Sequence, residues 1–160
     1  LLRAFGGAGD LVQGPKDGNQ ETFLHVDALP VAQHEPAHPL HELGQRYISG
    51  HGPVSVEDLQ AWSKLSKTQA TTALKSADAR RTRHDGQDFW MATWQEDVSA
   101  EDIRTALELR LELPAFDEYL LGYANKDWIV PDEIRVNVLT KKCLSWPWVM
   151  EGGRGVASLR

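Results

Sequence analysis

The sequence predicts an α+β protein in which a winged helix-turn-helix is followed by a small β-barrel-like domain. Three observations predict this class. Two capped helical patterns abut between Val54 and Ala77, a basic stretch with a hairpin turn follows them, and the last third of the chain contains short β-like runs. At 160 residues and 41% hydrophobic side chains, the chain can form one or two domains with folded cores.

The first residues are expected to end an earlier winged-helix unit. Residues 1–5 have the spacing of the last turns of an amphipathic helix, and glycines follow them. The runs at 11–12 and 22–26 are expected to be strands on either side of a loop rich in glycine. Because a hairpin after a helix is the end of a winged helix, we assign residues 1–28 to this unit. Residues 29–39 contain three prolines and are expected to be a linker.

Residues 40–95 are expected to form a complete winged helix-turn-helix. A helical pattern runs from Leu40 to Ile48 and ends at glycines. The pairs Ser55/Asp58 and Ser66/Gln69 have the spacing of capping boxes, so two more helices are expected to begin there. Asp85-Gly86 predicts the turn of a hairpin that follows the third helix, and such a hairpin is a wing.

The third helix is the expected recognition helix. Its apolar residues share one face, which leaves a polar face for DNA. The arginines that follow are expected to contact the DNA backbone from the wing. The predicted DNA-binding residues are Lys67, Thr68, Thr71, Thr72 and Lys75 on the helix, and Arg80, Arg81 and Arg83 on the wing.

The distribution of charge favours the same surface. The net charge is −6, but the segment from Lys64 to His84 contains six basic residues and one acidic residue. From Glu96 to Glu133 there are eleven acidic residues against three basic ones, which excludes a general phosphate-binding surface there. The expected partner is therefore double-stranded DNA, bound by the helix and the wing.

Residues 96–160 are expected to form an α/β segment and then a β-barrel-like region. Short runs with β-branched and aromatic residues at 128–130, 134–139, 145–150 and 156–159 predict strands. Before them lies Phe116-Asp117-Glu118-Tyr119, where paired carboxylates next to aromatic rings could position a water for attack at a sugar carbon. Asp117 and Glu118 are thus the catalytic candidates; their alternative role is to cap backbone amides or to pair with an arginine.

No metal, cofactor or membrane contact is expected. His34, His38 and His41 are spaced by four and three residues, but intervening prolines oppose the helix that would bring the imidazoles together. Cys143 is the only cysteine, which excludes a cysteine-rich zinc site. No apolar run approaches the roughly 20 residues that span a bilayer, and the start lacks the features of a secretion signal, so a cytoplasmic location is expected.

Four stretches together resemble a known family. They are GPKDGNQETFLHVDALP, RYISGHGPVSVEDLQAWSKLS, LELPAFDEYLLGY and EGGRGVASLR, and they follow one another over nearly the whole chain. The sequence is similar to the bacterial winged-helix DNA-binding family that includes the alkylpurine and crosslink-unhooking DNA glycosylases. The resemblance implies tandem winged helices followed by a small β-barrel, with this chain in the later part of that layout.

The resemblance leaves enzyme activity open. Glycosylases of this family have a catalytic motif of glutamine, a hydrophobic residue, then glutamine or aspartate, in a part of the protein that precedes the matched region. The nearest pattern here is Gln95-Glu96-Asp97, whose charged middle residue and place after the wing do not fit. The expected function is DNA binding; the alternatives are a DNA glycosylase with catalytic residues outside this chain, and a winged helix that is structural or contacts proteins. The oligomeric state is left open.

Overall fold

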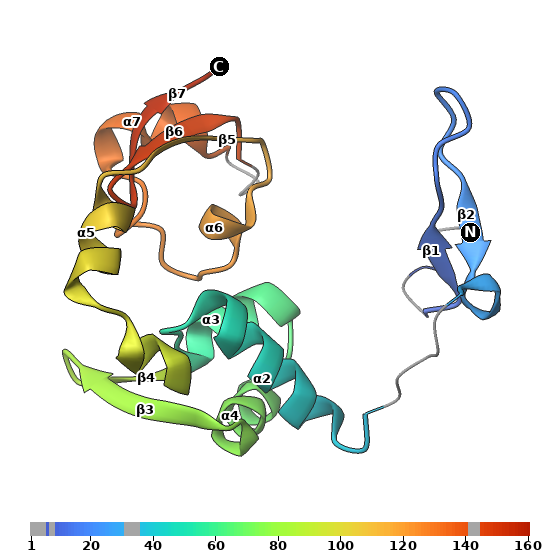
Figure 1. Ribbon diagram of the computed structural model, residues 1–160, viewed down its shortest axis with the longest axis horizontal. Coiled ribbons are helices and arrows are strands. Elements are labelled where there is room, and N and C mark those ends of the chain that lie inside the picture. Colours follow the sequence, from blue (N-terminus) through green and yellow to red (C-terminus); the bar gives the residue numbers. More distant parts are fainter. Residues whose placement is uncertain (1–5, 7–8, 31–35, 141–144) are drawn as a thin grey trace. The chain divides into compact units, whose positions relative to one another are not determined.

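The computed structural model describes residue 6 and residues 9–30, 36–140 and 145–160. The chain divides into two compact units, Leu1–Pro36 and Ala37–Arg160, whose helices and strands are labelled in Figure 1. The helix that the sequence predicts over residues 1–5 lies outside the described residues.

The first unit contains a β-hairpin. Strands β1 (Leu11–Gln13) and β2 (Phe23–His25) pair antiparallel, with Leu11 opposite His25, and a short 3-10 turn, Val26–Ala28, follows. The two strands confirm the hairpin expected in this region. Its role as the wing of an earlier winged helix stays a prediction.

The second unit begins with three helices and a hairpin. Helices α2 (Pro39–His51), α3 (Val56–Ser63) and α4 (Lys67–Ser76) precede the antiparallel strands β3 (Ala79–His84) and β4 (Gln87–Ala92), as the sequence predicts. They enclose the first core. Its buried residues are Tyr47, Ile48, Val54, Leu59, Ala70, Ala73, Leu74, Trp90 and Ala92.

Helices α2 and α4 approach each other closely. Gly44 of α2 is buried, and a Cβ atom placed on it would lie 2.2 Å from the carbonyl oxygen of Ala73 in α4. The backbones of the two helices are therefore in contact at this point. Only a residue without a side chain fits there.

The rest of the second unit forms a second core. The 3-10 turn η2 (Thr93–Asp97) and helix α5 (Ala100–Leu107) lead to a three-stranded antiparallel sheet and two short helices. The sheet has the order β5-β6-β7, and α7 packs against β7. The elements are β5 (Arg110–Leu113), α6 (Glu118–Leu121), α7 (Asp132–Val138), β6 (Trp148–Glu151) and β7 (Arg154–Ser158). The buried residues of the second core are Leu120, Ile129, Val130, Val138, Trp148 and Met150.

The β-barrel expected at the C-terminal end is not formed by the described residues. Their strands make three small antiparallel sheets, and none of these closes. Residues 128–130, expected as a strand, lie in a turn, and residues 134–139 lie mostly in α7. Pro131 at the N-cap and two acidic residues in the first turn favour this helix, and they outweigh the β preference of its branched side chains.

Helix α5 begins with a third capping box that the sequence reasoning missed. The hydroxyl of Ser99 accepts from the backbone N–H of Asp102, and the Asp102 carboxylate accepts from the hydroxyl and the N–H of Ser99. The hydrogen bond from the Ser99 hydroxyl has the largest effect on the pKa of Asp102, and the one from the Ser99 N–H the next largest. Both lower this pKa.

Polar contacts join the two cores of the second unit. The Tyr47 hydroxyl donates to the carbonyl oxygen of Gly122 at 2.5 Å, and the Tyr123 hydroxyl donates to that of His51 at 2.7 Å. Tyr47 belongs to the first core and Tyr123 packs against both, so these hydrogen bonds connect the two cores. The position of helices α2 to α4 relative to the C-terminal sheet therefore depends on directional hydrogen bonds.

We expect these tyrosines to make the protein sensitive to alkali. Burial, followed by nearby acidic groups, raises the pKa of Tyr47 far above 10, and burial raises that of Tyr123 to about 12. The unfolded chain releases these protons near pH 10, whereas the folded chain still holds them, so their contribution to stability is complete below pH 10; that of Tyr123 is lost between pH 10 and about 12, and that of Tyr47 declines over a wider range above pH 10. Urea titrations on both sides of pH 10 should show a smaller decline for Tyr123→Phe than for the unmodified chain. Equal declines would contradict this assignment.

Candidate nucleic-acid interface

Helix α4 presents a polar face to solvent. Ser66 caps its start through the predicted box with Gln69, and Ala70, Ala73 and Leu74 bury the opposite face. The five residues predicted to face DNA therefore lie on one side of a fixed helix, four of them exposed and Thr71 half-buried. The helix contains two lysines and no carboxylate.

A tight turn connects α3 to α4. Lys64 ends α3 in the left-handed conformation, with φ of 62°, and Leu65 packs against the first core. Ser66 then caps α4 directly. Both capping boxes and this turn are held by hydrogen bonds between residues that are close in sequence. These hydrogen bonds therefore set the angle between the axes of α3 and α4.

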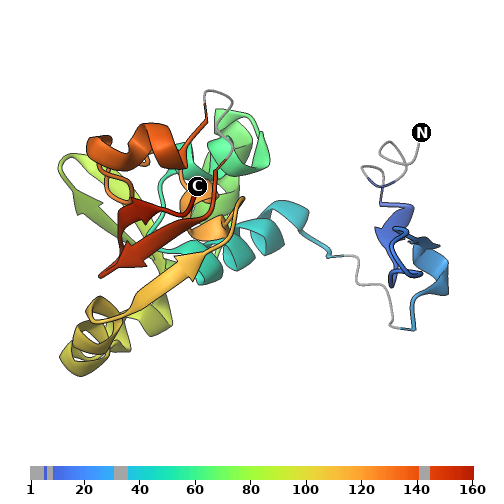
Figure 2. The same cartoon turned by 90° about the horizontal axis from the view of Figure 1, so that it is seen from above.

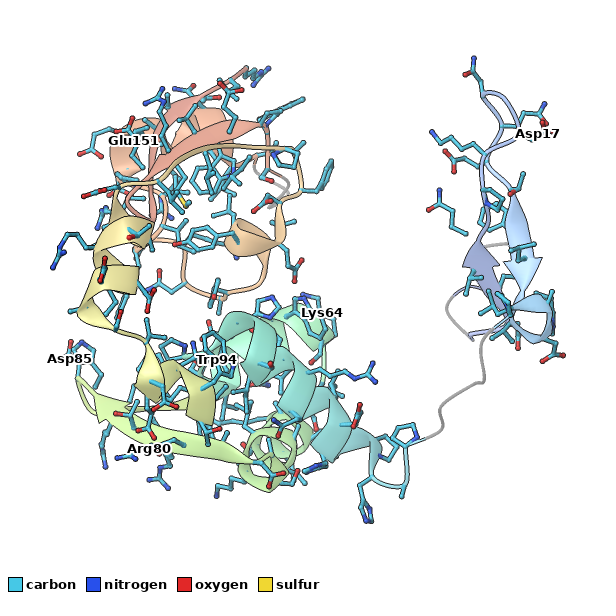
Figure 3. The ribbon with its side chains drawn as sticks, in the orientation of Figure 1. Asp17, Lys64, Arg80, Asp85, Trp94 and Glu151 are labelled. Carbon is cyan, nitrogen blue, oxygen red and sulfur yellow. The ribbon has the colours of Figure 1, made fainter. Side chains whose placement is uncertain are left out.

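The β3–β4 hairpin carries the predicted arginines. Its two-residue turn, Asp85-Gly86, has positive φ at both positions, as a type I′ turn requires. Because side chains alternate along a strand, Arg80 faces one side of the hairpin, while Arg81 and Arg83 face the other. The structure thus brings two of the three arginines together; Arg80 and the tip residue Asp85 are labelled in Figure 3.

Two of these arginines have carboxylate partners. Arg80 Nε lies 2.7 Å from Glu96 Oε1, and Arg81 Nη2 lies 3.0 Å from Asp88 Oδ2. All four side chains are solvent-accessible, so each ion pair contributes little to stability. The arginines can exchange these partners for other anions.

The other cations are less restrained. Arg83 donates to the carbonyl oxygen of Gly86 at 3.1 Å. The Nζ atom of Lys67 lies 3.8 Å from Oε1 of Glu57, which belongs to α3. Lys75 makes no ion pair with a described residue. The positive charge of this surface is therefore partly balanced by acidic neighbours.

The catalytic candidates Asp117 and Glu118 have structural contacts. Asp117 caps α6 by accepting the N–H of Tyr119 at 2.9 Å. Glu118 Oε1 accepts from the Trp62 indole and lies 3.1 Å from Nε2 of His51. The contact of Asp117 matches the capping alternative, whereas Glu118 meets a tryptophan and a histidine in place of a backbone amide or an arginine. A catalytic role of either residue stays a prediction.

A cavity of about 870 Å³ lies between the start of α3, strand β4 and the turn between β6 and β7. Its wall includes the rings of Phe89, Tyr119, Tyr123 and Trp128. None of the predicted DNA-binding or catalytic residues is among the described residues that line it. The cavity is therefore a feature apart from the predicted interface.

A comparison with known protein families shows to which family the chain belongs. The model of the family described as DNA glycosylase AlkZ-like matches residues 1–160. The chain belongs to the DNA glycosylase AlkZ-like family. This confirms the resemblance stated from the four sequence stretches.

Relatives of the AlkZ-like chain are longer. An interstrand DNA cross-link repair glycosylase from Streptomyces sahachiroi is 26% identical over an alignment of 144 residues, and the match covers 81% of this chain and 37% of that protein. The solved structure of Streptomyces sahachiroi DNA glycosylase AlkZ matches with a TM-score of 0.71 at 22% identity, over 92% of this chain and 42% of that one. This structural match supports the fold of the chain described above. The AlkZ-like chain spans less than half the length of these relatives.

Other predicted features of the AlkZ-like chain can be placed. Gln95, the first residue of the motif-like stretch, holds η2 by accepting the N–H of Ala92 and donating to the carbonyl oxygen of Gly52. His34 lies outside the described residues, and among those described no three His, Cys, Asp or Glu side chains form a group that could hold a metal. No helix in the described part of the chain has the length and apolar character to cross a membrane.

Sequence reasoning missed the acidic partners of the β3–β4 hairpin in this AlkZ-like chain. Asp88 lies opposite Arg83 in the hairpin register, so counting outward from the Asp85-Gly86 turn would have placed it among the arginines. No sequence pattern indicates that Glu96 lies near Arg80. The turn η2, which follows the hairpin, brings Glu96 back to it.

Proposed function

We propose that this AlkZ-like chain binds double-stranded DNA through a winged helix-turn-helix. Helix α4 lies in the major groove in this proposal, and the β3–β4 hairpin contacts the phosphate backbone. The observation that carries it is the exposed face of α4, which has lysines at both ends, threonines between them and no carboxylate. Membership of a DNA glycosylase family supports DNA as the partner.

The contacts of Val54 support the winged helix. Val54 N–H donates to the Trp90 carbonyl oxygen at 2.9 Å, and Trp90 N–H donates back at 2.8 Å. The segment between α2 and α3 thus adds one residue of a third strand to the hairpin, which anchors the wing to the helices. In this proposal residues 40–95 are the complete winged helix, residues 1–28 end an earlier one, residues 29–39 link the two, and residues 96–160 form a separate C-terminal region.

A second candidate function is DNA glycosylase activity of a longer protein. It is favoured by the name of the Streptomyces relative, an interstrand DNA cross-link repair glycosylase. In this version the catalytic residues lie outside the chain, and the chain supplies DNA binding. We expect the chain alone to bind duplex DNA and to release no alkylated base from it.

Removing the three wing arginines tests the proposal. We expect the variant Arg80→Ala, Arg81→Ala, Arg83→Ala to bind duplex DNA at least about tenfold more weakly, because phosphate contacts supply most nonspecific affinity. The slope of log affinity against log salt should fall by roughly one for each phosphate that the variant no longer binds. Fluorescence anisotropy at several salt concentrations measures both quantities.

A charge-matched variant is the control. Arg46→Ala, Arg104→Ala and Arg160→Ala remove the same charge from exposed positions outside α4 and the hairpin. This variant should keep most of the affinity. Equal losses in both variants would show that total charge, and not the wing, governs binding. If the unmodified chain shows no salt-dependent binding, the proposal is wrong and a winged helix that contacts proteins takes its place.

A further inference from the structure

Strand β5 is an edge with a partner on one side. The sheet order is β5-β6-β7, and within the described part of the chain β5 pairs with β6 alone. The opposite edge differs, because α7 packs against β7. In Figure 2, β5 runs along an outer margin of this sheet. Soluble proteins protect such edges or use them, since an open strand can pair with another chain.

The edge is apolar on one face. Leu111 is opposite the buried Met150, and Leu113 is opposite the buried Trp148, so these leucines face the second core. Leu111 nevertheless remains 40% exposed, and Leu109, which precedes the strand, 46% exposed. The apolar face of the sheet therefore continues to its edge and is left uncovered there.

The sequence of this edge is complementary to itself. Residues 109–113 read Leu-Arg-Leu-Glu-Leu, with Leu111 at the centre. If two copies pair antiparallel about Leu111, Arg110 of each copy lies opposite Glu112 of the other, and Leu109 lies opposite Leu113. The leucines of both copies then share one face of the sheet. In each of the two Arg110–Glu112 pairs between the copies, the charges are opposite.

We propose that β5 is a self-association edge, through which a second copy of this chain pairs antiparallel to form a two-fold symmetric dimer. The two three-stranded sheets become one continuous sheet with Leu111 on the two-fold axis. Leu109 and Leu111, which are 46% and 40% exposed, supply apolar area at this edge. A strand of four residues buries little surface, so we expect the dimer to depend on protein concentration. The edge is distinct from α4 and the wing, so the proposal does not rest on DNA binding.

The charges on the edge make a sharp test possible. Arg110→Glu places glutamate opposite glutamate across the axis, and Glu112→Arg places arginine opposite arginine. Each variant repels its own copy at two positions. Mixed in equal amounts, however, the two variants again pair opposite charges at both positions. Arg110 also meets Glu151 within its own sheet, a contact that Glu112→Arg leaves unchanged.

Sedimentation velocity over a range of concentrations measures the association. We expect the unmodified chain to form dimers, each single variant to dimerise at least roughly tenfold more weakly, and the equimolar mixture to regain dimers. Thermal unfolding of both variants establishes that the monomers are folded. A monomeric unmodified chain, single variants that dimerise normally, or a mixture of folded variants that stays monomeric would each overturn the proposal.

Discussion

Gly44→Ala is expected to destabilise the second unit by about 3 kcal/mol, with a fall in Tm of the order of 10 °C. The added methyl group would lie 2.2 Å from the oxygen and 2.6 Å from the carbon of the Ala73 carbonyl, both backbone atoms that no side-chain rotation can move away. Helices α2 and α4 would have to separate, and the intrinsic preference of alanine for helices, about 1 kcal/mol, offsets only part of the loss. Thermal and urea unfolding followed by circular dichroism measure the change.

Gly50→Ala is the matched control, because Gly50 lies in the same helix. No heavy atom lies within 4 Å of a Cβ placed there, and the residue is exposed. The alanine should leave stability unchanged or raise it by up to about 1 kcal/mol. If Gly44→Ala proved as harmless as Gly50→Ala, the close contact between α2 and α4 would be wrong.

Asp58→Asn is expected to cost about 2–4 kcal/mol, because its buried carboxylate accepts three hydrogen bonds. Oδ2 accepts from the N–H and the hydroxyl of Ser55 at 2.8 and 2.7 Å, and Oδ1 accepts from the N–H of Ala124 at 2.8 Å. An asparagine has one acceptor oxygen, so in either orientation of its amide an NH2 group meets a backbone N–H. Urea unfolding measures the loss.

Asp102→Asn is the control that distinguishes the effect of burial at Asp58 from the effect of its capping box. Asp102 forms the same capping box with Ser99, but it is exposed, and its carboxylate accepts no hydrogen bond from a second residue in the described part of the chain. Water can satisfy the amide there, so a distinctly smaller loss is expected. Comparable losses for the two variants would mean that the contact between Asp58 and Ala124 contributes nothing.

The first core could be predicted from sequence because its signals are local. Each capping box spans four residues, and the Asp85-Gly86 turn fixes the hairpin register by itself. The second core could not, because its local signals conflict. Branched residues in 134–139 indicate a strand, whereas Pro131 and the acids after it start a helix, and the helix forms where it can pack against β7.

The candidate site shows the same division. The exposed face of α4 follows from helical periodicity, and the alternation of the arginines follows from the hairpin register. Contacts between distant segments had no signal in one sequence. Examples are Glu96 beside Arg80, and Glu118 beside His51 and Trp62, since both depend on how the chain turns back on itself.

The carboxylates beside Arg80 and Arg81 have a consequence for selectivity among anions. A small anion such as sulfate would have to displace an internal competitor at each arginine and would gain one contact in return. In the proposed complex a duplex would replace several competitors in a single event, since its phosphates are joined and regularly spaced. In the proposed complex Glu96 and Asp88 would thus lower the affinity of these arginines for a single small anion more than for a polymer.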